Sequence, residues 1–340
     1  MFDTSENQFS PRPATHRTCG RGNGRFLSLV SVTVAFCVPP SWLAQAQNLS
    51  RNPSPAAVLQ IDHVSFATSN LEVLRASLLS VGLGPEPSEP HGNATRTASI
   101  HFENRTTIEM IGPDGSGVIQ GSDWVKLIGG DAGACFWAVV TRDLGREADV
   151  LRKRGVAVAE PEHGSFKLPD GVNVEWVSAQ VGSGRPGSIL PVLVEDQSPH
   201  SRRDQVSESA RGAPVAGVGR VVIGVTNLDA AIVLYGKVFD WSGAVRESSD
   251  DFGRLAYFPG QPVILASPAG KGWLADHLAA FGEGPVAVLL AATNYNAASR
   301  RYPLSSPSLW FGRKVGWFPP GKLKTMRLGV VEQTSIADHP

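Results

Sequence analysis

The sequence has 340 residues, a formal net charge of +0 and 42% hydrophobic residues, so it can bury one large or two ordinary cores. The balanced charge gives no electrostatic reason to expect a nucleic acid or an anionic membrane surface as a partner. The 36 glycines and 25 prolines favour a fold rich in strands and turns over a helical bundle.

The first 46 residues have the three regions of a secretory signal peptide. Arginines precede the apolar run FLSLVSVTVAFCV, two prolines follow it, and Ala44-Gln45-Ala46 forms a small-residue cleavage site. The sequence therefore predicts a secreted or periplasmic protein that begins at Gln47; a tail with a chance apolar patch is the alternative. Only Cys135 lies beyond this segment, in the apolar run ACFWAVV, so we expect a buried thiol and no disulfide.

Four later segments share one pattern, in which an apolar strand is followed by a threonine, a polar turn and an amphipathic helix. They are VSFATSNLEVLRASL, FWAVVTRDLGREADVLRKRG, VVIGVTNLDAAIVLYGKVF and VAVLLAATNYNAASRRY, spaced by roughly 70 to 80 residues. Short strand-like runs bounded by Gly and Pro follow each helix. The pattern predicts four supersecondary units, two on each side of residues 197–214, whose polar and charged composition is typical of a linker.

Alternation in the first unit divides its side chains between two sheet faces. In the strand LQIDHVSFA, one face is expected to hold Gln60, Asp62, Val64 and Phe66, and the opposite face Leu59, Ile61, His63 and Ser65. In SIHFE, His101 is expected on the face opposite Ile100 and Phe102, and in TIEMI, Glu109 on the face opposite Ile108 and Met110. A helix over about Asn70 to Ser80 can cover only the apolar face, so His63, His101 and Glu109 should share the other one. Two imidazoles and a carboxylate there could form a ligand or metal site.

These segments also resemble a known superfamily. A strand that opens with Asp-His-Val, a helix, and a later strand with a glutamate in an apolar run resemble the vicinal oxygen chelate superfamily. The pair His91-Gly92 and the run LPVLVED most resemble its glyoxalase-like domain. The resemblance implies an α+β fold of tandem βαβββ modules, paired into two cupped mixed sheets with helices on the outer face. It implies a glyoxalase-like domain at 57–196 and a second, degenerate domain at 215–333.

The resemblance further implies that His63 and Glu109 bind a divalent metal ion, such as Zn, Ni, Mn or Fe. Other ligand positions depart from the superfamily pattern. Phe136 stands at the His63 position of the second unit; it cannot bind a cation, but it could contact a substrate. Glu195 could supply a second carboxylate or a substrate contact. The second domain lacks the ligand set, because its corresponding positions fall on Arg220 or Val221, Ile264, and Ala287 or Val288.

Two more histidines have several possible roles. His101 could line the cup, replace a lost ligand, act with Glu109 in catalysis, or simply face solvent. His91 could lean over the site as a substrate contact or be a plain turn residue. The sequence has no phosphate-cradling glycine loop, so no nucleotide cofactor is expected. It also has no nucleophile elbow.

Two functions are compatible with these features. The first is an exported glyoxalase-like enzyme, a metal-assisted lyase, isomerase or hydrolase that acts on a small oxygenated molecule. In this hypothesis the ion polarises a carbonyl and a carboxylate moves the proton. The second is a non-catalytic protein that sequesters a small molecule in the same cup, which the missing ligands and the degenerate second domain favour.

Overall fold

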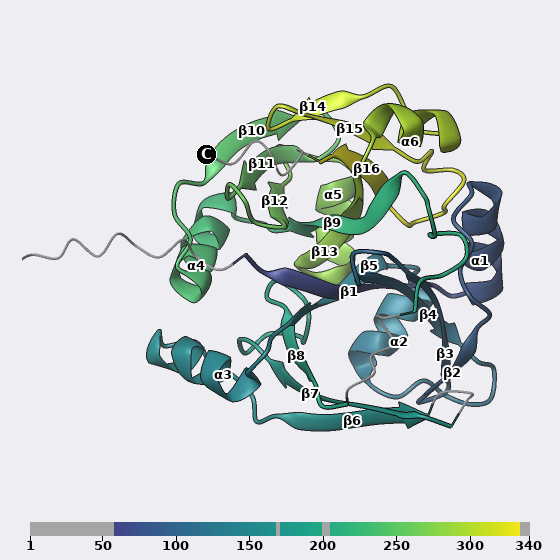
Figure 1. Ribbon diagram of the computed structural model, residues 1–340. Coiled ribbons are helices and arrows are strands. Elements are labelled where there is room, and N and C mark those ends of the chain that lie inside the picture. Colours follow the sequence, from purple (N-terminus) through teal and green to yellow (C-terminus); the bar gives the residue numbers. More distant parts are fainter. Residues whose placement is uncertain (1–57, 168–170, 199–204, 334–340) are drawn as a thin grey trace, which may run out of the picture. The chain divides into compact units, whose positions relative to one another are not determined.

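The computed structural model describes residues 58–167, 171–198 and 205–333, which all belong to one compact unit (Figure 1). The predicted signal peptide, residues 1–46, lies outside the described residues, as does part of the predicted linker, residues 199–204. None of the helices in these described ranges has both the length and the apolar character needed to cross a membrane.

Two eight-stranded mixed sheets with equivalent topologies make up the fold, in the orders β2-β3-β4-β1-β5-β8-β7-β6 and β10-β11-β12-β9-β13-β16-β15-β14. The first contains β1 (Gln60–Ala67), β2 (Glu89–Gly92), β3 (Thr95–His101), β4 (Thr107–Pro113), β5 (Gly133–Val140), β6 (Glu162–Lys167), β7 (Asn173–Gln180) and β8 (Val192–Asp196). The second contains β9 (Val215–Gly224), β10 (Val245–Ser249), β11 (Gly253–Tyr257), β12 (Val263–Ser267), β13 (Gly284–Ala292), β14 (Ser308–Trp310), β15 (Arg313–Trp317) and β16 (Leu328–Glu332). In each sheet two units meet through an antiparallel pair of first strands, β1 with β5 and β9 with β13. The predicted α+β fold of tandem βαβββ units is confirmed.

Four helices occupy equivalent places, each directly after the first strand of its unit. They are α1 (Leu71–Ser80), α3 (Leu144–Lys153), α4 (Leu228–Phe239) and α6 (Tyr295–Arg301). Each is preceded by an Asn or Asp whose side chain accepts a hydrogen bond from a backbone N–H three residues later, namely Asn70, Asp143, Asn227 and Asn294. The repeated polar turn is therefore a helix N-cap, which satisfies a backbone donor that the helix leaves unpaired.

Two further helices have no counterpart in the predicted units. Helices α2 (Ser122–Gly129) and α5 (Trp273–Phe281) connect the two units within each sheet, and Figure 1 shows each inside the curve of its sheet. Leu127 of α2 packs in a small apolar cluster with Ala67 of β1 and Ile111 of β4. Each concave face is therefore partly covered by a helix of its own.

One hydrophobic core is shared by the two sheets. It contains side chains of the first sheet and its helices, such as Val64 and Leu78, and of the second, such as Val221 and Tyr235. Strands β5 and β13 lie beside each other. The linker between the sheets is also anchored: in the segment 205–214, the described part that adjoins β9, Ser207 and Ala210 are almost fully buried.

The turn between β3 and β4 docks on the first strand of the second sheet. The backbone N–H of Asn104 donates to the carbonyl of Ala216 at 3.0 Å, and the N–H of Val218 donates to Oγ1 of Thr106 at 2.8 Å. Gly217 lies between these contacts with φ +145°, and a Cβ atom added there would come within 2.6 Å of the Thr106 hydroxyl. Only glycine leaves room for the turn at this position.

Candidate functional site

The concave face of the first sheet carries a cavity of about 920 Å³. Strands of both units line it, together with Trp124 of α2. Five residues singled out from the sequence are in its walls, namely His63, His91, His101, Glu109 and Phe136. Alternation predicts a shared face for the two strand histidines and the glutamate, and the structure places all three in this cavity.

A β-bulge in β1 changes the face of Asp62. The register of β1 against β5 shifts between Ile61 and His63, so Asp62 is an extra residue in the strand. A bulge of this kind re-aims a side chain. Asp62 lines the cavity beside His63, whereas Ile61 packs in the hydrophobic core. The predicted faces of Asp62 and Ile61 are therefore wrong, because strict alternation does not continue through a bulge.

The imidazole of His63 contacts Asp62 and Phe136. Its Nδ1 lies 3.0 Å from Oδ2 of Asp62, whose side chain is 8% exposed. Its ring stacks on Phe136, with 5.4 Å between the ring centroids and 21° between the ring planes. A carboxylate at Nδ1 favours the tautomer that carries its proton there, so Nε2 becomes the basic nitrogen. The arrangement suits an imidazole that accepts a proton.

Glu109 lies near His63 because β4 runs parallel to β1. The register pairs Glu109 with Ser65 and His63 with Thr107, and Oγ of Ser65 donates to Oε2 of Glu109 at 2.8 Å. His63 and Glu109 are therefore diagonal neighbours, with Cα atoms roughly 8 Å apart for ordinary strand spacing and rise. Side chains at this separation can act on one ligand from the same side.

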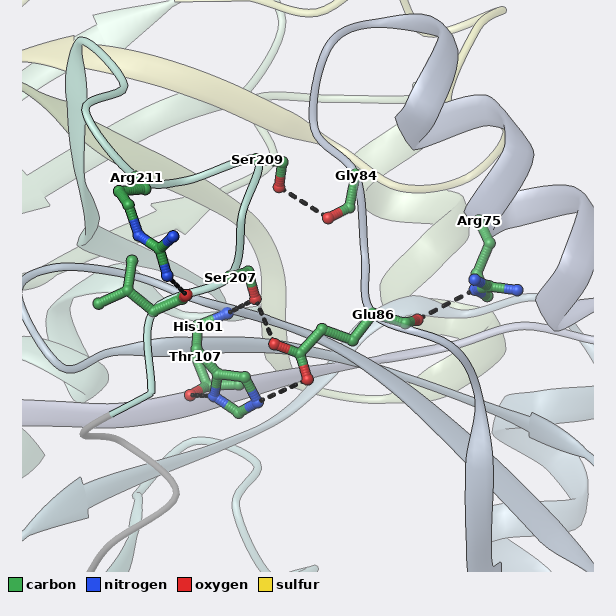
Figure 2. Close-up of polar contacts among 9 residues, drawn as sticks. Arg75, Gly84, Glu86, His101, Thr107, Ser207, Ser209 and Arg211 are labelled. Carbon is green, nitrogen blue, oxygen red and sulfur yellow. Dashed lines mark hydrogen bonds and ion pairs between the residues drawn. The ribbon is translucent and has the colours of Figure 1, made fainter. Parts of the chain in front are cut away.

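His101 is 4% exposed, so the solvent-facing alternative is wrong. Its Nδ1 lies 3.0 Å from Oγ1 of Thr107, and its Nε2 lies 3.9 Å from Oε2 of Glu86 (Figure 2). The hydroxyl of Ser207 donates to Oε1 of Glu86 at 2.8 Å and accepts from the backbone N–H of His101 at 2.9 Å. His101 is thus a wall residue whose contacts lead from the cavity to the segment 205–214.

Of the two remaining predicted site residues, His91 lines the cavity and Glu195 does not. His91 lies on the short edge strand β2, exposed at the rim of the cavity, and not in a plain turn. Glu195 does not line the cavity, although its neighbour Val194 does. Oε2 of Glu195 accepts from the backbone N–H of Leu144 at 2.7 Å, at the start of α3. A carboxylate there complements the positive end of a helix, so the substrate-binding or metal-binding role predicted for Glu195 does not fit its position.

The cavity also contains residues that the sequence reasoning missed. They include Asp62 on β1, Trp124 on α2, His163 and Lys167 on β6, and Trp176 on β7. The alternation in NVEWVS puts Trp176 on the same face as Val174 and could have indicated it. The bulge that turns Asp62 inward has no comparable signal in the sequence.

The described residues do not fit a complete metal site. A divalent ion normally needs three or more protein ligands. Across 58–333, leaving out the gaps at 168–170 and 199–204, no three His, Cys, Asp or Glu side chains gather as an ion would require. His63 and Glu109 are two candidate donors, but Phe136 is stacked where the second unit would supply another. His101 is engaged with Thr107 and lies near Glu86.

The second sheet has an apolar concave face. The Phe252 ring lies 5.0 Å from that of Trp310 and 4.9 Å from that of Trp317, measured between centroids. Leu274 of α5 and Ile264 of β12 belong to the same buried cluster. Ile264 is the residue at a superfamily ligand position, so this part of the second sheet is packed as core.

One protein-family model matches the part of the chain that lines this cavity. A family model described as a glyoxalase-like domain matches residues 61–239. No curated protein sequence matches this chain.

Solved structures with similar folds are more distant in sequence. A hypothetical protein from Staphylococcus aureus is 11% identical with a TM-score of 0.51, over 81% of this chain and 100% of that chain. The Mn(II)-bound glyoxalase from Novosphingobium aromaticivorans is 10% identical with a TM-score of 0.49, over 82% and 83%. Methylmalonyl-CoA epimerase from Mycobacterium tuberculosis is 19% identical with a TM-score of 0.33, over 40% and 97%. At 11% identity the likeness to the Staphylococcus aureus protein concerns the fold alone.

Proposed function

Because the chain belongs to the glyoxalase-like domain family and has the vicinal oxygen chelate fold, we propose that it binds a small oxygenated molecule in the first-sheet cavity and moves a proton on it. The reaction class is that of an isomerase or lyase. The observation that carries the proposal is the pair His63 and Glu109 in one cavity wall, each held by a polar neighbour.

In the proposed reaction His63 acts as the base. With Asp62 at Nδ1, the Nε2 atom takes a proton from a carbon next to the ligand's carbonyl, and the electrons of the broken C–H bond form an enolate. Return of the proton to the neighbouring carbon or oxygen completes an isomerisation without an oxidant or reductant. Glu109 relays the proton between adjacent atoms of the ligand.

The divalent ion expected from the resemblance has no step in this reaction. The two donors His63 and Glu109 fall short of the three or more that an ion needs, as described above. Elemental analysis of the purified protein tests this directly. A stoichiometric ion that is lost in His63→Ala would contradict the metal-free reaction.

Solvent exchange tests the proton transfer without knowledge of the natural substrate. The protein is incubated in D₂O with a panel of small 2-oxo and 2-hydroxycarbonyl compounds, and deuterium at the carbon next to the carbonyl is followed by NMR. We expect His63→Ala and Glu109→Gln to slow the exchange by about 10²–10⁴-fold. The matched control is Glu175→Gln, an exposed glutamate of β7 that does not line the cavity. Equal exchange in all variants would refute the proposed roles.

A second candidate function is sequestration without catalysis. It is favoured by Phe136, which replaces a ligand of the superfamily pattern and packs against His63. Tight binding of a small molecule with no solvent exchange would select this function over the first.

A further inference from the structure

The cavity has two chemically different walls. The lining residues of β1, β3 and β4 are polar, with Ile111 as the exception. The strands β5, β7 and β8 contribute only apolar side chains to the lining, namely Phe136, Val174, Trp176 and Val194. A ligand that fills this space meets hydroxyl, imidazole and carboxylate groups on one side. On the other side it meets a hydrocarbon surface bordered by the polar residues His163, Ser165 and Lys167 of β6.

Glycines fix the two aromatic rings of the apolar wall. Gly164 pairs with Trp176 across β6 and β7, and a Cβ added at Gly164 would lie within 2.6 Å of three atoms of the indole ring. A Cβ added at Gly187, in the loop between β7 and β8, would lie within 2.6 Å of ring atom Cε2 of Phe136. Both rings therefore lie against backbone. Phe136 and Trp176 also pack on the buried cluster that contains Val194. The wall is formed before any ligand arrives.

The polar wall, formed by β1, β3 and β4, presents hydrogen-bonding side chains on adjacent strands. Ser99 faces Glu109 across β3 and β4, and Ser65 faces Glu109 across β1 and β4. Ser65 and Ser99 are almost fully buried, so a ligand oxygen that reaches them is shielded from water. The edge strands add charge of both signs, Lys167 on β6 and Glu89 on β2.

We propose, building on the function given above, that the ligand is a flat ring with several oxygen substituents, and that one substituent carries the carbonyl and the neighbouring C–H bond on which the proton is moved. The ring packs on Trp176 and Phe136, and the oxygens meet the polar wall around Ser99 and Glu109. A cavity of about 920 Å³ lies in the range of sites for drug-sized molecules, so one or two rings fit. Because aromatic stacking and hydrogen bonds act on different atoms of such a ligand, removal of either should weaken binding.

Three related carboxylates separate these contributions. Gallate has an aromatic ring with three hydroxyls; shikimate has the same number of hydroxyls on a ring that is not aromatic; benzoate has the ring without hydroxyls. Binding to the full-length protein is measured by NMR titration at millimolar concentrations. We expect gallate to bind at least about tenfold more tightly than either of the others. Equal affinities for gallate and shikimate, or no gallate binding, would overturn the proposal.

Matched tryptophan variants place the ring. Trp176→Leu should weaken gallate binding about tenfold, whereas Trp317→Leu, in the equivalent strand β15 of the second sheet, should leave it unchanged. Thermal melting of both variants shows whether each is folded. A gallate affinity that is the same in Trp176→Leu and the native protein rejects the ring site.

The outcome for the ligand class is distinguishable from that for the proton transfer. His63→Ala and Glu109→Gln report on solvent exchange, and Trp176→Leu reports on gallate binding. Gallate binding that depends on Trp176, without solvent exchange in the carbonyl panel, would support the ligand class and reject the proton transfer. Exchange that depends on His63, without gallate binding, would support the proton transfer and reject the ligand class.

Discussion

Replacing Gly164 by alanine should move the ring of Trp176 while leaving the protein folded. The new Cβ would lie within 2.6 Å of three indole atoms, whereas carbon atoms in contact rest about 3.5–4.0 Å apart. The ring must therefore retreat by about 1 Å or more. Gly164 is on the edge strand β6 and is not among the residues with positive φ, so its backbone accepts an alanine.

Two opposing effects set the change in the free energy of unfolding. Overpacking costs about 1–3 kcal/mol, and the low end applies because the half-buried ring of Trp176 can swing toward solvent. Gly-to-Ala replacement at a compatible backbone stabilises by about 0.4–1 kcal/mol, since it restricts the unfolded chain. We expect a net destabilisation below roughly 2 kcal/mol, together with gallate binding weakened about tenfold, as for Trp176→Leu.

Fluorine NMR of protein labelled with 5-fluorotryptophan follows this ring among the eight tryptophans. Trp176→Phe identifies its resonance by deletion. Gly129→Ala is the control, because a Cβ there would meet nothing within 4 Å. If Gly164→Ala leaves both the Trp176 resonance and the gallate affinity unchanged, the ring is not fixed by Gly164 and the reasoning fails.

Four further predictions concern stability, reactivity and export. Because Ile108 is fully buried, Ile108→Ala should lower the free energy of unfolding by about 2–5 kcal/mol in chemical denaturation and preserve solvent exchange. Glu109→Gln should slow solvent exchange and leave the free energy of unfolding largely unchanged. Burial, with a smaller effect of Arg327, lowers the pKa of His277 to about 4 from 6.5. The folded state thus resists protonation, and stability should fall by about 3 kcal/mol as pH drops from 6.5 toward 4, a loss absent in His277→Gln. Burial raises the pKa of the Cys135 thiol to about 12, so near pH 8 a disulfide reagent should react only after unfolding; rapid labelling of the native protein would contradict this. Mass spectrometry of exported protein should find an N-terminus at Gln47, and intact cytoplasmic chain would contradict export.

The sequence predicted those parts of the site that depend on local rules. Ile108, Glu109 and Met110 alternate in an unbroken strand, so the face of Glu109 followed from period-two geometry. The starts of α1, α3, α4 and α6 also followed from local chemistry, because each has an Asn or Asp that caps the first turn. These features need no knowledge of the rest of the chain.

Other parts depend on tertiary contacts or on irregular pairing. The bulge at Asp62 exists only in the register between β1 and β5, so alternation placed Asp62 on the wrong face. Glu195 matched a superfamily position loosely, but its oxygens are used by the start of α3 and by Gln197. The wall around Trp176 forms only when the strands of the second unit complete the cup. Helix α5 could have been predicted, since Leu274 and Leu278 have helical spacing.

The docking of the β3–β4 turn on Gly217 has a consequence for how such a chain can evolve. The loop after His101, in the wall of the cavity, rests on the second half of the molecule through Asn104 and Thr106. The second half of the molecule therefore supports a wall of the cavity without contributing a residue to its lining. A recombination that exchanged the second half for an unrelated domain would also remove the glycine that admits this turn. Division of labour, with one cup open and the other filled by aromatic side chains, is the outcome that such coupling permits.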